Sequence, residues 1–306
     1  WLLFAIYRQV QGQTHLEASW QQVQASFQSS QIGYLLGIVL LMVFNWGLEA
    51  AKWRLSVAVV QPVSFWQSFK AVLSGVSFSV TMPNRVGDYL GRILYLPEGA
   101  RLKVISLTVV GSISQLMVTM ATGTIGFLVL KERLIHAGLL NAITYQFAAF
   151  GILFVTIILT LFYFNLGLIE RALERWFRAS SYLYLVEAIR EFGMQRLSRL
   201  LLLSGVRYAV FISQYILAFR FFSVDVSLLQ AVAVMSLVFL ALAVIPSIVL
   251  VEVGIRGQVS LQLVGLFTAN SLGILLTSVT IWAINLMVPA LIGSVLILSV
   301  KVFKRQ

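Results

Sequence analysis

The chain has no cysteine, only two histidines and few charged residues. The absence of cysteine excludes disulfides, thiolate zinc sites and cysteine nucleophiles. His15 and His136 are too few for a histidine-based metal centre. Charged residues make up 11% of the 306 residues, whereas an average soluble domain has about 25%. Because 59% of the chain is hydrophobic, we expect an integral membrane protein with almost no soluble domain.

Motifs of known enzyme classes are also missing. The sequence has no G-x-x-x-x-G-K-[ST], no H-E-x-x-H and no G-x-S-x-G, and its 11 acidic residues are scattered. We therefore expect no catalytic residue, no metal site and no cofactor. The net charge of +11 could suggest nucleic acid, but Lys and Arg lie between apolar runs, as membrane topology requires. The expected partner is the bilayer, not nucleic acid.

Long apolar runs are the main feature that the sequence does have. About 20 apolar residues cross the hydrocarbon core. The run at 71–84 has only 14 residues and is too short to cross comfortably. The opening residues 1–7 are expected to be the end of a truncated span, with a signal-peptide remnant as the alternative. Longer runs lie at 32–48, 104–130, 142–164, 200–219, 226–251 and 257–300, the last expected to break at Asn270, Ser271 and Gly273.

The distribution of Lys and Arg predicts the orientation of the chain. Seven of these cations lie between 52 and 103, six between 171 and 199, and none between 9 and 31. Placing the cation-rich loops in the cytoplasm makes the chain near 67–101 enter from the cytoplasm and return. By the same reasoning the chain near 226–270 enters and returns from outside. Two such hairpins suggest an inverted repeat; two fully crossing arms per hairpin would give the same end points.

We therefore predict one all-α transmembrane domain over 1–306, with about six to eight membrane segments. Its first half is expected at 1–130 and its second at 200–306. The connection at 131–199 holds one span and then 170–199, which mixes cations with aromatic residues. This segment is expected to be amphipathic and to lie at the cytoplasmic interface, or to be an ordinary charged linker.

Charged residues accompany both hairpin breaks. Arg85, Asp88 and Arg92 have spacings of three and four, so a helix would place them on one face. Their net positive charge suits a phosphate, since the guanidinium fork matches phosphate oxygens. The alternative is a positive cytoplasmic loop with an incidental ion pair. Glu252 and Arg256, four residues apart, could form a structural ion pair or a substrate or proton site.

Three further polar residues are weaker candidates for a substrate site. Glu49 ends an apolar run and could simply pair with Lys52 at the interface. Gln115 lies in mid-span, where it could face a cavity or bond a neighbouring helix. Arg207 lies inside a span and could extend to the cytoplasmic surface or contact a head group.

At these motifs the chain resembles the lysylphosphatidylglycerol synthase transmembrane-region family, also called the flippase-like domain family. The resemblance rests on four segments: 45–54, Pro83-x-Arg85-x-Gly87-Asp88-x-x-x-Arg92, Pro246 with Glu252, Gly254 and Arg256, and 289–293. The family more usually has Gly-Glu where this chain has Gly87-Asp88, and Arg-Glu where this chain has the acid first. Members fused to a synthase domain handle aminoacylated phosphatidylglycerol. No such domain is expected here, and stand-alone relatives are associated with isoprenoid-linked or other lipids.

The resemblance implies a multi-pass protein of a bacterial or archaeal plasma membrane that moves a lipid between leaflets. We expect the lipid to carry a phosphate, as in a phospholipid or polyprenyl phosphate, and the charged residues at the two breaks to contact it. One alternative is a membrane transferase acting on a lipid phosphate. Another is a non-catalytic membrane partner of a lipid-modifying enzyme. The sequence does not predict an oligomeric state.

Overall fold

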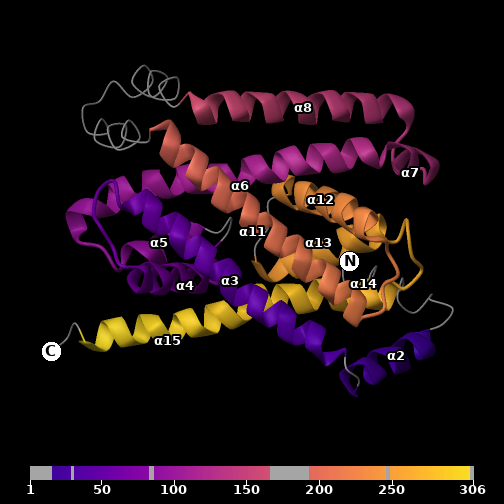
Figure 1. Ribbon diagram of the computed structural model, residues 1–306, viewed down its shortest axis with the longest axis horizontal. Helices are drawn as coiled ribbons and strands as arrows, with labels where there is room; N and C mark the ends of the chain where they lie inside the picture. Colours follow the sequence, from indigo (N-terminus) through magenta and orange to yellow (C-terminus); the bar gives the residue numbers. More distant parts are fainter. Residues whose placement is uncertain (1–15, 29–30, 83–85, 166–192, 246–248, 304–306) are drawn as a thin grey trace. The chain divides into compact units, whose positions relative to one another are not determined.

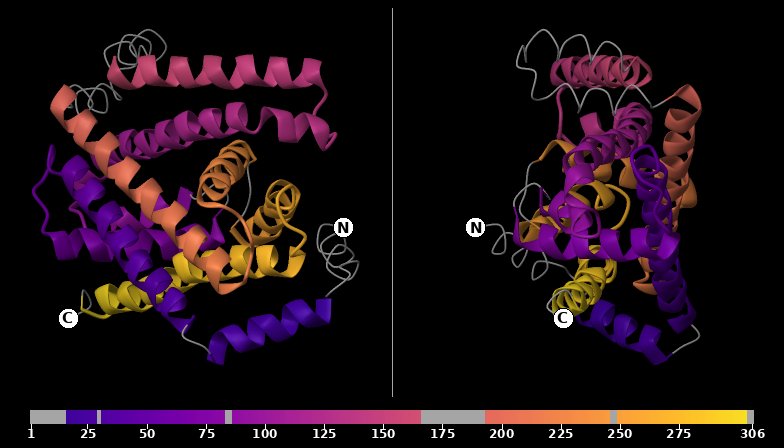
Figure 2. Two further views of the ribbon diagram at one scale, coloured as in Figure 1. Left: turned by 45° about the vertical axis from the view of Figure 1, so that its right-hand side comes forward. Right: turned by 90° about the vertical axis from the view of Figure 1, so that its left-hand side faces the viewer.

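The computed structural model describes residues 16–28, 31–82, 86–165, 193–245 and 249–303, and every regular element in these ranges is helical (Figures 1 and 2). The predicted all-α class is confirmed. The predicted N-terminal span at 1–7, Arg85, and most of the predicted amphipathic segment at 170–199 lie outside the described residues.

In the described part of the chain, five helices are long and apolar enough to cross a membrane. Of two shorter helices, α2 (Leu16–Gln28) precedes the first of the five and α7 (Lys131–His136) lies between α6 and α8. The five comprise α3 (Ile32–Val57), α6 (Arg101–Val129) after the 3₁₀ turn η2 (Glu98–Ala100), α8 (Ala142–Phe164), α11 (Met194–Phe221), and α14 (Ser271–Trp282), which continues through the π-helical η4 (Ala283–Met287) into α15 (Val288–Phe303).

The predicted break near 270 is present. The preceding helix ends at Val264 and α14 begins at Ser271. Asn270 caps α14, because its Oδ1 accepts a hydrogen bond from the backbone N–H of Gly273 at 2.8 Å. Its Nδ2 donates to the carbonyl oxygens of Phe222 and Ser223, which anchors the start of α14 to the end of α11.

The chain forms two compact units. Unit 1 consists of Trp1–Phe44, Thr119–Ile152 and Ala209–Val288, and unit 2 of Asn45–Val118, Leu153–Tyr208 and Pro289–Gln306. All five candidate spans contribute residues to both units. The two pairs of shorter helices described next each belong to a single unit.

The first predicted hairpin corresponds to α4 (Phe65–Thr81) and α5 (Val86–Ile93), in unit 2 (Figure 1). The Ser64 hydroxyl caps α4 by accepting from the Gln67 backbone N–H at 3.2 Å. The helix ends at an extended Met82, because the proline that follows disfavours the helical conformation in the residue before it. With 17 and 8 residues, α4 and α5 are about 25 Å and 12 Å long, shorter than the roughly 30 Å hydrocarbon core.

Glycines allow α4 and α5 to pack with their backbones in contact. A Cβ on Gly87 would overlap the Phe78 carbonyl, and a Cβ on Gly91 would overlap the Ser74 carbonyl and the Gly75 backbone. Because the contacts pair early α5 residues with late α4 residues, the two helices are antiparallel. This geometry is compatible with the predicted re-entrant hairpin, whose position in the membrane remains a prediction.

The second predicted hairpin corresponds to α12 (Leu228–Val244) and α13 (Val249–Val264), in unit 1. A capping box starts α12, since Ser227 Oγ accepts from the Gln230 backbone N–H and Gln230 Oε1 accepts from the Ser227 backbone N–H. An extended Ile245, again before a proline, ends the helix. The two helices pack against each other, and α13 also packs against α14.

Apolar packing in unit 2 fixes the parts of α6, α8 and α11 that lie within it. The Tyr163 hydroxyl donates to the Leu197 carbonyl oxygen at 2.9 Å, which joins α8 to α11. One turn beyond Leu200, the hydroxyls of Ser114 on α6 and Ser204 on α11 lie 2.8 Å apart. Gln115 follows Ser114 on α6, and Arg207 lies three residues after Ser204 on α11. The core consists of Leu107, Val110, Met117, Tyr163, Leu197 and Leu200.

Candidate functional site

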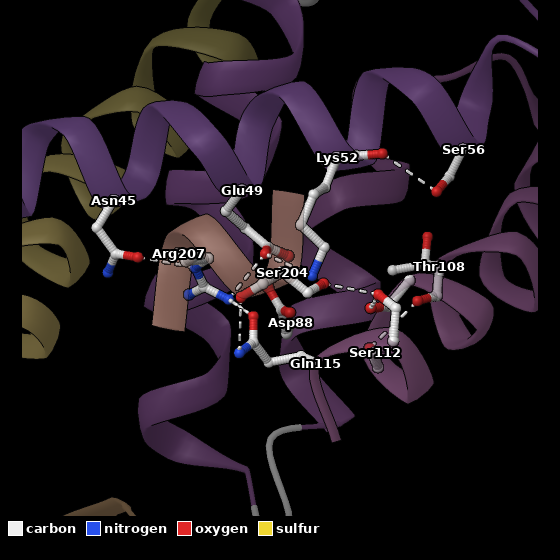
Figure 3. A network of polar contacts seen from close by, with 12 residues as sticks. Asn45, Glu49, Lys52, Ser56, Asp88, Thr108, Ser112, Gln115, Ser204 and Arg207 are labelled. Atoms are coloured by element: carbon white, nitrogen blue, oxygen red, sulfur yellow. Dashed lines mark hydrogen bonds and ion pairs between the residues drawn. The ribbon is translucent and has the colours of Figure 1, made fainter. Parts of the chain in front are cut away.

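Unit 2 contains a largely buried group of charged side chains that α3, α5 and α11 bring together. We call it the ionic cluster; it consists of Glu49, Lys52, Asp88, Arg92 and Arg207. Figure 3 shows the side chains of Glu49 and Lys52 extending from α3 towards Arg207 of α11. The five residues come from three stretches that lie far apart in the sequence, so the complete cluster exists only in the folded protein.

Glu49 is the centre of the ionic cluster. Its Oε1 accepts a hydrogen bond from Arg92 Nη2 at 2.9 Å. Its Oε2 lies 2.9 Å from Arg207 Nη1 and 3.6 Å from Lys52 Nζ. Both contacts are ion pairs. The Glu49 carboxylate thus contacts three cations from three helices.

Asp88 and Arg92 form a two-point ion pair on α5. Arg92 Nε donates to Asp88 Oδ1 at 3.0 Å, and Arg92 Nη2 donates to Asp88 Oδ2 at 2.6 Å. This is the parallel geometry in which a guanidinium binds a carboxylate or a phosphate. Gly75 of α4 makes room for the pair, since a Cβ there would overlap the Asp88 carboxylate.

Arg207 has polar partners on α3 and α6. Its Nε donates to Asn45 Oδ1 at 2.9 Å, and its Nη1 donates to Gln115 Oε1 at 3.5 Å (Figure 3). Its guanidinium also lies 5.5 Å from the ring centroid of Trp46, within the range of a cation–π interaction. These contacts link the mid-span Gln115 to the ionic cluster.

Counted over the described residues, the ionic cluster has one cation more than it has carboxylates. Lys52, Arg92 and Arg207 face Glu49 and Asp88. The side chains of Lys52 and Arg92 are 3% and 5% exposed, whereas that of Asp88 is 25% exposed. Asp88 is therefore the member that an incoming ligand can reach most easily, and the surplus charge is positive.

Unit 1 contains a smaller ionic group. Glu252 Oε1 accepts from Arg256 Nη2 at 2.5 Å, and Arg256 Nη1 donates to the Tyr215 hydroxyl oxygen at 3.0 Å. We call these three residues the Arg256 clamp. Its Glu252 and Arg256 side chains are 9% and 13% exposed. Their predicted helical pairing is confirmed, and their proposed contact with substrate stays a prediction.

The sequence identified local pairs and missed the tertiary contacts that join them. Spacing predicted that Asp88 and Arg92 share a helix face and that Glu49 pairs with Lys52, and both contacts are present. Nothing in the sequence placed Arg207 on Glu49, or Asn45 and Trp46 around Arg207. The available signal was that several polar residues lie inside apolar runs, where unpaired ones are costly. Arg85, the remaining predicted residue of the first hairpin, lies outside the described residues.

The surplus positive charge of the ionic cluster is of the sign that suits an anion. No group of three or more His, Cys, Asp or Glu side chains that could hold a metal ion occurs in the described ranges. Two hairpins of short helices among long apolar helices, with guanidinium groups buried at both, define an α-helical multi-pass membrane protein with a polar interior.

A family comparison identifies this class more narrowly. The family model described as "Lysylphosphatidylglycerol synthase TM region" matches residues 14–293, and the chain belongs to that family. The resemblance expected from the four motif segments is confirmed, and a membrane-lipid context follows from it. A search of the curated proteins gave no significant match, and neither did a search of the solved structures.

Proposed function

We propose that this protein moves a lipid with a phosphate-bearing head group between the leaflets of a plasma membrane, and that the ionic cluster binds the phosphate. The observation that carries the proposal is the surplus positive charge of the cluster, held among helices that are apolar enough to cross a membrane. The lipid tails would stay in the bilayer while the head group crosses through protein.

The charge of the ionic cluster matches that of a phosphodiester. An unpaired charge is costly in hydrocarbon, so the three cations and two carboxylates of the described cluster leave one positive charge that a ligand would compensate. A lipid phosphodiester carries one negative charge and would complete the balance. A zwitterionic or uncharged head group without phosphate would not.

Asp88 gives a physical route for the phosphate to enter. Arg92 already donates two parallel bonds to the Asp88 carboxylate, and a phosphate can accept the same two bonds. Asp88 is also the most exposed member of the ionic cluster. The phosphate would displace the carboxylate from Arg92, while Glu49 keeps the guanidinium in place.

Purified protein in liposomes tests the proposal. The probe is phosphatidylglycerol with a fluorescent acyl chain, and its arrival in the outer leaflet is followed by quenching from outside. Arg92→Gln and Arg207→Gln should reduce exchange at least tenfold, because each removes the surplus charge. Arg133→Gln is the matched control: its side chain is exposed on α7, so exchange should be unchanged.

Binding to detergent-solubilised protein provides a second measurement. Asp88→Asn should bind phosphatidylglycerol more tightly than the wild type, since it removes the internal competitor for Arg92. Wild-type exchange in both cluster arginine variants would refute the proposal. Chemical conversion of the lipid by the wild type would support a transferase instead. If the wild type shows no lipid exchange and no chemical conversion, the result would support a non-catalytic membrane partner.

A further inference from the structure

Trp46 of α3 carries a buried hydrogen-bond donor. The residue is 8% exposed, and its indole Nε1 has no hydrogen-bond partner among the described residues. A buried indole N–H usually finds an acceptor, and leaving a buried donor unpaired costs free energy. Because the Nε1 atom is itself shielded from solvent, bulk water does not satisfy it. The donor is therefore available to a ligand that supplies an oxygen.

The position of Trp46 ties this donor to the ionic cluster. Its ring centroid lies 5.5 Å from the guanidinium of Arg207, and Glu49 follows three residues later on α3, so the two side chains are neighbours on the helix surface. Arg92 and Arg207 contact different oxygens of the Glu49 carboxylate, both at 2.9 Å. The two guanidiniums are therefore adjacent. A head group whose phosphate is bound by Arg92 can place its next atoms beside Arg207 and Trp46.

Gln115 of α6 places an amide against the same guanidinium (Figure 3). Its Oε1 accepts from Arg207 Nη1, and its Nε2 donates to the Ser204 carbonyl oxygen, both at 3.5 Å. Hydrogen bonds from N–H to oxygen are usually about 2.9–3.0 Å long, so these two are weak. The side chain is half-buried. Since an amide both donates and accepts, a ligand hydroxyl can replace these long bonds at little cost.

Trp53 shows what distinguishes Trp46 from other buried tryptophans. Trp53 lies on the same helix, is 1% exposed, and its Nε1 likewise has no partner in the described structure. No cation lies against its ring among the described contacts. An unpaired indole N–H does not by itself indicate a ligand site. Trp46 differs because it lies against an arginine of the ionic cluster.

The chemistry around Trp46 favours one kind of head group. A hydroxyl is neutral and both donates and accepts hydrogen bonds, which matches the indole N–H of Trp46 and the amide of Gln115. An ammonium, as in an ethanolamine or aminoacyl head group, has no acceptor atom for the indole N–H. It would also lie beside Arg207, where like charges repel each other. A purely apolar substituent would leave the indole donor unpaired.

We propose that the indole N–H of Trp46 and the amide of Gln115 form a subsite for the part of the head group beyond the phosphate, and that this subsite selects a hydroxyl-bearing head group over a cationic or apolar one. In the bound state a hydroxyl oxygen accepts from Trp46 Nε1, and the hydroxyl donates to Gln115 Oε1. The inference rests on the proposed function, since the phosphate at Arg92 positions the head group. It adds the chemical class of the substrate, which net charge alone does not specify.

Two lipids that differ only in their hydroxyls test the subsite. Phosphatidylglycerol and phosphatidylpropanol have the same charge and the same three-carbon head group, and the second lacks both hydroxyls. Short-chain forms are titrated into the detergent-solubilised protein by calorimetry. The wild type should prefer phosphatidylglycerol about three- to tenfold, the effect of one hydrogen bond. Trp46→Phe keeps an aromatic ring against Arg207 and removes the N–H, so it should bind the two lipids equally.

Trp53→Phe is the matched control, because it removes the same N–H from the same helix away from the ionic cluster, and it should keep the preference. If Trp46→Phe does not fold, Gln115→Met provides a second variant. It keeps the length of the side chain and removes the amide, so it should also reduce the preference. Equal binding of the two lipids by the wild type would overturn the subsite, as would a full preference in Trp46→Phe or in Gln115→Met.

Arg92→Gln separates this inference from the proposed function. It should weaken the binding of both lipids about tenfold or more and to the same extent, because both carry the phosphate. If Arg92→Gln weakens neither lipid while Trp46→Phe abolishes the preference, the phosphate is bound elsewhere and the hydroxyl subsite stands. If the wild type binds neither lipid, both proposals are wrong.

Discussion

Glu49 offers the sharpest test of how the ionic cluster is held together. Glu49→Gln keeps the size of the side chain and removes its charge. In the wild type this carboxylate lies 2.9 Å from two guanidinium nitrogens and 3.6 Å from the Lys52 ammonium. The substitution leaves three cations with the Asp88 carboxylate alone, so the surplus positive charge rises from one to two.

The size of the effect follows from burial. Removing one partner of a buried ion pair costs about 3–5 kcal/mol, because the other charge is left without compensation. The Glu49 side chain is 12% exposed and its cations are 3–14% exposed. Since three cations lose their partner together, we expect Glu49→Gln to reduce the free energy of unfolding by about 5 kcal/mol, the upper end of that range.

The matched control is Glu98→Gln in η2. Glu98 lies 3.6 Å from Arg101, but its side chain is 90% exposed, and exposed ion pairs contribute only about 0–1 kcal/mol. The free energy of unfolding is measured in detergent by denaturant titration, with the helical circular dichroism as the signal. Equal losses of less than about 1 kcal/mol for Glu49→Gln and Glu98→Gln would refute the reasoning.

Three further substitutions test other parts of the structure. Gly91→Ala should destabilise the protein by about 1–3 kcal/mol, because its Cβ would meet α4 backbone atoms. Its control, Gly151→Ala, has open space at the Cβ and should be neutral or stabilising by up to about 1 kcal/mol. Similar melting temperatures for the two variants would contradict this. Asn270→Ala should cost about 2 kcal/mol, and Asn270→Asp less, since Asp retains the cap of α14; a neutral Asn270→Ala would show that the cap is dispensable. Arg92→Lys should melt between Arg92→Gln and the wild type, since Lys keeps the charge and loses the fork; a Lys variant no better than the Gln variant would show that charge alone contributes nothing.

The hairpins could be predicted from sequence because their causes are local. Proline disfavours the helical conformation in the residue before it, and glycine lets the backbone of a second helix come into contact. The breaks and their close packing therefore follow from residues within a few positions of each other. The i,i+4 ion pair of Asp88 and Arg92 is local for the same reason. The predicted break at Asn270 is a helix cap and also depends on neighbouring residues.

Helix lengths were less predictable, because an uncharged run is only part of a membrane helix. The run at 32–48 stops before Glu49, but α3 continues to Val57, since Glu49 and Lys52 are paired and buried within it. The run at 71–84 begins after Lys70, but α4 begins at Phe65 and Lys70 is exposed. Whether a charge ends a helix depends on partners that only the fold supplies. For the same reason, the sequence did not predict that Arg207 belongs to the ionic cluster.

Charge balance distinguishes the ionic cluster from the Arg256 clamp. Among the described residues the charges of the ionic cluster do not cancel, whereas those of Glu252 and Arg256 do. Under the proposed function, a phosphate would be attracted to the cluster by its net positive charge and would displace the Asp88 carboxylate from Arg92. Because Asp88 competes with the phosphate for the same two donors, it would also favour release of the head group, which a lipid transporter needs as much as binding.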